Sequence, residues 1–374
     1  MPGRLESFFL RKTSTARLQL DALDGLRGAA VLIVVLSHLS NADLYLLPGL
    51  DLRGTGKSGV YLFFALSAFL LTKPLLRSEM DLRDPRGWVR YALRRVLRIF
   101  PLYWLVLFSN WAFAQWAPTR AMPSLTTDEF VGHLLLQQGK GVYWTIPVEV
   151  TYYLVLPWVA LAYRALRLDL ALVSCATAAA IGAALLAWPP AESAKDTLHL
   201  GVYLPIFLLG SYAAVVDARV ERLAGQQTAL RRIASALACA GLLGVAALSP
   251  AVGSAVFGEE LPKDWTHRQF LAFGALWGAV VFGAVNGGAW LERVLASRPL
   301  RLIGVVSFSI YLWHVPVARS LVLAQLPSPW LISWAVLLVS IAVGMLSFAL
   351  IEWPLTRSAR VARWRRSVAG RQGP

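Results

Sequence analysis

Long apolar runs separated by short polar stretches dominate this sequence of 374 residues. A helix needs about 20 mostly apolar residues to cross a bilayer. Ten segments come close to this length: 26–46, 59–76, 99–117, 144–163, 169–188, 200–217, 231–249, 269–288, 303–324 and 329–352. The pattern therefore predicts an all-α, polytopic membrane protein with about ten transmembrane helices. The shorter amphipathic segment 127–138 is expected to lie at the membrane interface.

The composition agrees with a single membrane domain rather than several soluble ones. Hydrophobic residues make up 57% of the chain and charged residues 15%, whereas a soluble domain carries about 25% charge. Fifteen tryptophans also fit, because aromatic rings favour the membrane interface. We expect a cytoplasmic lead-in at 1–25, without the apolar core of a signal peptide, a membrane domain at 26–352 and a basic cytoplasmic tail at 353–374.

The net charge of +15 raises the question of nucleic-acid binding. If both termini are cytoplasmic, 28 of the 36 Lys and Arg residues lie in cytoplasmic segments and seven lie in outer loops. This asymmetry follows the positive-inside rule. Basic residues on the cytoplasmic side also attract the anionic lipid headgroups of that leaflet. The expected partner of the basic residues is therefore the bilayer of the cell (inner) membrane, and no nucleic acid is predicted.

The sequence predicts no metal site. Its two cysteines, Cys175 and Cys239, both lie inside apolar runs. Buried cysteines of this kind behave as small packing residues. We expect both to be reduced, with neither a disulfide nor a metal bound.

Two ionisable residues share the first predicted span. Arg27 and His38 are 11 positions apart, which is about three helical turns, so both face the same way about 16 Å apart along the axis. Ionisable residues inside a membrane are costly and are candidates for function. The alternative is that Arg27 only fixes topology and His38 only bonds a neighbouring helix.

Three further ionisable residues lie inside predicted spans: Glu149, His314 and Arg319. Glu149 is expected near the depth of His38, where a carboxylate could orient the ring and stabilise its charged form; otherwise it ties helices together. His314 is either a packing residue or part of a polar cavity. Arg319, and Trp144 just before Glu149, are further candidates to line such a cavity.

Arg95 and Arg98 precede the third span and share a helical face. The planar fork of an arginine suits phosphate recognition. At the cytoplasmic mouth of the span, at about the level of Arg27, the pair predicts either an anion site or a topology anchor.

Five segments together resemble motifs of the acyltransferase-3 family of membrane proteins: "LDGLRGAAVLIVVLSH", "GVYLFFALSAFLLT", "RRVLRIFPLYW", "YWTIPVEVTYYLVLP" and "SFSIYLWHVPV". The resemblance covers about residues 20–355. It implies transfer of an acyl group, usually acetyl, from cytoplasmic acyl-CoA to a hydroxyl of a sugar, lipid-linked glycan, peptidoglycan or small metabolite. The family's Arg–ten residues–His motif falls on Arg27 and His38, and its Arg-x-x-Arg motif on Arg95 and Arg98.

The family's Trp-Ser…Glu block falls on Trp144 to Glu149, with departures nearby. Thr145 stands where serine is usual, and Val150 where a second acidic residue is common. Ala68 replaces the glycine of an "LSGF" block. The resemblance therefore does not carry a role for a second acid to this chain.

The resemblance and the residues together predict a membrane-bound O-acyltransferase. Arg27, Arg95 and Arg98 are expected to bind the nucleotide of acyl-CoA, most simply acetyl-CoA. His38 is expected to act as general base or transient acyl carrier, oriented by Glu149. Two other classes stay open: a proton-coupled transporter of a polar metabolite and a non-catalytic membrane scaffold.

Overall fold

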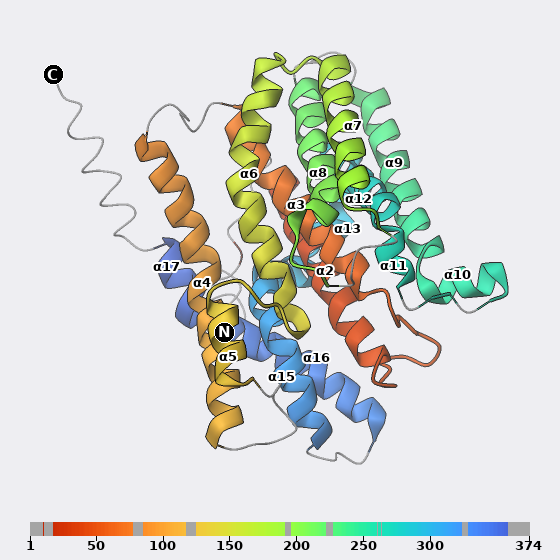
Figure 1. The fold of residues 1–374 in the computed structure, drawn as a ribbon. Helices are drawn as coiled ribbons and strands as arrows, with labels where there is room; N and C mark the ends of the chain where they lie inside the picture. The colour runs from red at the N-terminus through yellow and green to blue at the C-terminus, as the bar shows by residue number, and fades with distance from the viewer. Residues whose placement is uncertain are drawn as a thin grey trace.

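The computed structural model describes residues 10, 18–77, 85–116, 125–190, 196–221, 227–259, 261–262, 264–323 and 328–357. In these residues the secondary structure is helical, and no strand occurs. Figure 1 shows the longer helices side by side in one bundle, with α4 and α17 on one flank and α9 and α10 on the other. The predicted all-α class is confirmed.

The helices have the following bounds: α2 Leu18–Ser40, α3 Gly56–Leu76, α4 Pro85–Trp116, α5 Thr127–Leu134, η2 Gly141–Trp144, α6 Thr145–Ala165, α7 Leu170–Ala187, α8 Leu200–Val220, α9 Gln227–Ala247, α10 Pro250–Phe257, α11 Trp265–Arg268, α12 Phe270–Asn286, α13 Ala289–Leu295, α14 Arg298–Val305, α15 Ser307–Leu323, α16 Pro329–Ser347, η3 Phe348–Glu352 and α17 Trp353–Arg357. The η2 element is a 3-10 helix and η3 is a π-helix.

The described residues contain eight single helices long and apolar enough to cross a membrane, and ten spans if each of two bent helix pairs counts as one. The ten predicted segments coincide with these elements, and the protein is a multi-pass membrane protein. Some predicted boundaries were wrong: α2 begins earlier than residue 26 and ends at Ser40, and α4 begins at Pro85 rather than residue 99. The segment predicted to be amphipathic forms the short helix α5.

Two of the predicted spans contain breaks that the apolar pattern did not show. Helices α12 and α13 meet at 109°, and α14 and α15 meet at 77°. The second break lies at Val306, between the end of α14 at Val305 and the start of α15 at Ser307. As a result α14 packs along α2, while α15 turns away and brings its first turns to the candidate site described below.

Helix α3 lies at the centre of the bundle and packs against α2, α6, α8 and α12. Lys73, in the last turn of α3, forms two ion pairs with residues of and just after α8. Its Nζ atom lies 2.6 Å from the carboxylate of Asp217 and 2.9 Å from that of Glu221. Asp217 is fully buried and also accepts a hydrogen bond from Asn286. A buried carboxylate needs such donors to stay charged, so this cluster ties α3, α8 and α12 together.

The contact between α2 and α14 requires glycine. A Cβ atom on Gly28 would lie 2.2 Å from the Leu300 carbonyl oxygen, and one on Gly304 would lie 1.7 Å from the Asp24 carbonyl oxygen. Small residues allow membrane helices to approach backbone to backbone. This close contact fixes the height and rotation of α2 at the position of Arg27.

The outer surface of the bundle is apolar, as a bilayer requires. Leu186 on α7 and Leu243 on α9 are among the most exposed side chains, at 85% and 71%. Most of the predicted lead-in and basic tail lies outside the described residues. The cytoplasmic location of both termini stays a prediction.

Candidate active site

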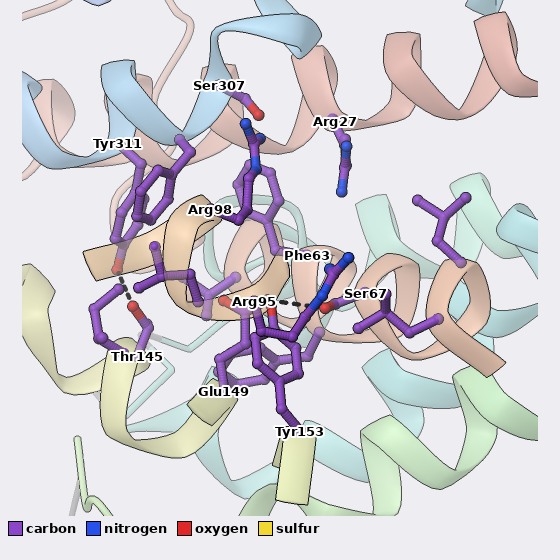
Figure 2. Close-up of a pocket in the computed structure, with 17 residues that line it drawn as sticks. Arg27, Phe63, Ser67, Arg95, Arg98, Thr145, Glu149, Tyr153, Ser307 and Tyr311 are labelled. Atoms are coloured by element: carbon purple, nitrogen blue, oxygen red, sulfur yellow. Dashed lines mark hydrogen bonds between the residues drawn. The ribbon is translucent and has the colours of Figure 1, made fainter. Parts of the chain in front are cut away.

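A cavity of 100 Å³ lies between α2, α3, α4, α6 and α15 (Figure 2). Seventeen residues line it, and four of them were predicted as site residues: Arg27, Arg95, Arg98 and Glu149. The structure therefore brings four side chains from three different helices into one site, although they are up to 122 positions apart in the sequence.

We call this cavity the arginine pocket, and its three arginines differ in the groups that they contact. Figure 2 shows Arg27 reaching in from α2 and Arg98 extending toward Ser307 at the start of α15. The guanidinium of Arg95 lies 5.7 Å from the centre of the Tyr153 ring, a cation–π contact. Its Nε atom is buried and has no hydrogen-bond partner among the described residues. A buried donor without a partner is expensive, so this group suits an anionic ligand.

Arg98 is paired with Glu352, a residue that the sequence motifs did not single out. The Arg98 guanidinium donates to the Glu352 carboxylate, which is 1% exposed and also accepts from Ser309 Oγ at 2.5 Å. Glu352 lies in the π-helix η3 at the end of the last predicted span. The rule applied to the other intramembrane charges, that each is a candidate for function, would have identified it.

Glu149 belongs to the arginine pocket. Its Oε1 atom accepts hydrogen bonds from Ser67 Oγ at 2.8 Å and from the Tyr153 hydroxyl at 2.5 Å. Ser67 and Tyr153 line the same cavity and were not predicted. The carboxylate is thus oriented by two hydroxyl groups and lines the same cavity as the three arginines. Its predicted role in orienting His38 stays a prediction.

Trp144 is buried at the end of η2, just before the cavity residue Thr145. Its ring centroid is 5.1 Å from Lys57 Nζ and 5.0 Å from the Tyr203 ring. The next residue, Thr145, donates from Oγ1 to the Tyr311 hydroxyl at 3.2 Å, as the dashed line in Figure 2 shows. Thr145, one of the departures from the family pattern, therefore fixes the side chain of Tyr311.

His38 lies at the far end of α2 from Arg27, and its side chain is exposed. Its ring packs against that of His314, with 5.1 Å between the ring centroids. His314 is 1% exposed. Its Nδ1 atom donates to the Tyr311 carbonyl oxygen at 2.6 Å, since a carbonyl only accepts. The Nε2 atom is buried without a hydrogen-bond partner in the described part of the chain.

Tyr311 connects the two groups of predicted residues. Its side chain lines the arginine pocket, and its carbonyl oxygen holds His314, which in turn packs against His38. Arg319 lies five residues beyond His314 on α15, with an exposed side chain, on the side away from Ser307. The structure thus groups Arg27, Arg95, Arg98 and Glu149 at one level and His38 with His314 at another.

The comparisons with known proteins agree with the motifs. The acyltransferase-3 family, described as an acyltransferase domain, matches residues 20–350. The chain is 22% identical to the peptidoglycan O-acetyltransferase OatA of Listeria monocytogenes, over 93% of this chain and 57% of that protein. It is 25% identical to the putative membrane-bound transacylase BcsY of Komagataeibacter xylinus, over 88% and 81%, and 28% identical to nodulation protein 10 of Rhizobium leguminosarum bv. viciae, over 92% and 96%.

The chain spans little more than half the length of OatA. No solved structure matches it. The family match covers nearly all of the described bundle, including the arginine pocket and the histidine pair. The chain belongs to the acyltransferase-3 family of membrane acyltransferases.

Proposed function

We propose that this protein is an O-acyltransferase of the cell (inner) membrane that moves an acyl group, in the simplest case acetyl, from cytoplasmic acyl-CoA to a hydroxyl group. The acceptor classes are a glycan, a lipid-linked saccharide or a secondary metabolite. The observation that carries the proposal is the convergence of Arg27, Arg95 and Arg98 on one cavity of a bundle that also holds two histidines in contact. The names of the relatives, which include a peptidoglycan O-acetyltransferase, support a glycan acceptor.

The arginine pocket is the proposed donor site. Guanidinium groups pair well with phosphate, and the partnerless Nε of Arg95 fits such a ligand. The cavity volume of 100 Å³ is below the about 300–1,000 Å³ of usual small-molecule sites. The nucleotide of the donor is therefore placed at the mouth of the pocket, and only the narrow pantetheine arm and its thioester enter the bundle.

His38 is the proposed catalytic residue. As a general base it takes the proton of the acceptor hydroxyl while the oxygen bonds to the thioester carbon, the C–S bond breaks and the CoA sulfur leaves, to be protonated to the thiol. In the alternative route, a His38 nitrogen first takes the acyl group from sulfur and then passes it to the hydroxyl oxygen. His314 is proposed as a positioning residue, because its buried ring packs on His38 and is itself fixed by Tyr311.

Purified His38→Ala tests the proposal by acetyl transfer from acetyl-CoA to a panel of glycan acceptors. We expect transfer to fall by a factor of about 10² or more, the usual contribution of a general base. His199→Ala, at an exposed histidine before α8, is the matched control and is expected to stay active. Wild-type transfer by His38→Ala contradicts the mechanism, and metabolite flux without acyl-CoA consumption in the wild-type protein contradicts the enzyme class.

The donor site is tested by binding of CoA. We expect the Arg95→Ala/Arg98→Ala double variant to bind CoA at least about tenfold more weakly, because charged hydrogen bonds contribute about 1.5–3 kcal/mol each. Arg94→Ala, at an exposed neighbour on the same helix, is the control for loss of charge alone. Unchanged CoA affinity in the double variant would exclude this pocket as the donor site.

A further inference from the structure

A second cavity, of 510 Å³, lies between the first half of α4 and the middle of α6. We call it the α4–α6 groove. Its walls are formed by Trp88 to Phe100 on α4 and by Val150 to Trp158 on α6. The volume lies within the about 300–1,000 Å³ that is usual for binding sites of small molecules. It is thus large enough for a ligand and is separate from the volume of the arginine pocket.

The walls of the groove are apolar and open to the outside of the bundle. Leu154 is 70% exposed, Trp158 64% and Val89 59%. Figure 1 shows α4 and α6 inclined to each other at the edge of the bundle. In a bilayer these side chains meet hydrocarbon rather than water. A lipid-facing, concave, apolar surface is complementary to a hydrocarbon chain.

The length and ends of the groove also match a lipid chain. Trp88 and Trp158 pack together at one end, with 5.9 Å between their rings. Tryptophan favours the membrane–water interface, so this end is the natural level for a headgroup. From Trp88 the wall continues for 12 residues to Phe100, which is about 18 Å of helix. The groove therefore leads from the interface into the apolar core.

Positive charge lies beyond one end of the groove and on its inner wall. Arg164 is 11 positions beyond Tyr153 on α6, about three turns, so it shares the helical face of Tyr153 and lies nearer the interface than Trp158. At the inner wall, the half-buried Arg95 and the buried Tyr153 line both the groove and the arginine pocket. Cationic side chains near the membrane surface attract anionic headgroups.

We propose that the α4–α6 groove is a binding site for one hydrocarbon chain of an anionic phospholipid, whose headgroup lies toward Arg164. The chain runs past the tryptophan pair and ends against Phe100 and Val150. The site is distinct from the proposed donor site, although Arg95 and Tyr153 form part of the wall between them. Lipid binding here does not depend on the acyl-transfer proposal.

The test is photo-labelling of the full chain in lipid bilayers. Two phospholipid probes carry the same diazirine on an acyl chain, one with a phosphatidylglycerol headgroup and one with phosphatidylcholine. Labelled peptides are mapped by mass spectrometry. We expect the phosphatidylglycerol probe to label residues 88–100 and 150–158 preferentially, and Arg164→Gln to reduce its preference over phosphatidylcholine about fivefold, the factor expected for one cationic side chain near the surface.

Ala92→Trp fills the groove from α4 and is expected to remove most of this labelling, and Val150→Trp fills it from α6 if the first variant does not fold. Leu186→Trp places the same ring on an exposed site of α7 and is expected to change nothing. Labels spread evenly over all exposed helices, or unchanged in both filled variants, refute the site and indicate bulk lipid only. Equal labelling by the two probes refutes the anionic headgroup.

Discussion

Replacing Arg98 by glutamine is expected to affect stability and donor binding by two separable routes. Glu352 is 1% exposed and accepts from Arg98 and from Ser309. Without Arg98 the buried carboxylate keeps only the serine among its partners in the described residues. Breaking a buried ion pair by removing one partner costs about 3–5 kcal/mol. Because the Arg98 side chain is 25% exposed and solvent can replace part of the contact, we expect the lower end, about 3 kcal/mol.

The double variant Arg98→Gln/Glu352→Gln separates the two roles. With both charges removed, the free energy of unfolding should return to within about 1 kcal/mol of the wild type, because neutral replacements of buried ion pairs are often well tolerated. CoA affinity should not return, since the guanidinium is still missing. Glu352→Gln alone keeps Arg98 and should bind CoA.

The assay is unfolding in mixed detergent micelles for stability, together with calorimetric titration of CoA for binding. A double variant no more stable than Arg98→Gln would show that the two residues are not energetically coupled. A double variant that binds CoA like the wild type would show that Arg98 acts only by holding η3, and would remove it from the proposed donor site.

Three further outcomes follow from contacts in the structure. Glu149→Gln should leave the protein folded but lower acyl transfer, measured with acetyl-CoA, and wild-type rates would exclude a role. Asp217→Ala leaves Lys73 without its buried partner and should lower the free energy of unfolding by about 3 kcal/mol. Burial lowers the pKa of His133, whose Nε2 accepts from the Lys140 amide. Its contribution to stability is therefore present above the ordinary histidine pKa and is lost as the pH falls toward the lowered value, which hydrogen exchange at Lys140 can follow.

The apolar pattern predicted the number and order of spans because each span must bury about 20 residues in lipid whatever its neighbours are. It could not predict the break at Val306, since no proline or polar cluster marks it and the bend depends on how α14 packs against α2. The same holds for the contact of Gly28 with Leu300, which requires knowledge of the partner helix.

Spacing within one helix was also sufficient to place Arg27 and His38 on α2, and Arg95 beside Arg98 on α4. Spacing within one helix could not predict which residues of different helices contact each other. Depth estimates suggested that Glu149 would lie near His38, whereas its hydrogen bonds in the structure are to Ser67 and Tyr153. Counting residues along each helix separately does not fix how two helices are placed against each other, and the packing of α6 against α3 puts Glu149 at the level of the arginines.

For the proposed reaction, the distance between the two parts of the site restricts the donor. The arginine pocket and His38 are about 16 Å apart along α2, and Tyr311 joins them through its contact with His314. A donor that keeps its phosphates on Arg27 and Arg95 reaches His38 only if a long, narrow and largely uncharged arm separates its charge from its reactive carbon. Phe63 and Tyr311 in the cavity wall suit such an arm better than a second charge. A donor whose phosphate is directly bonded to the transferred group could not contact both sites at once.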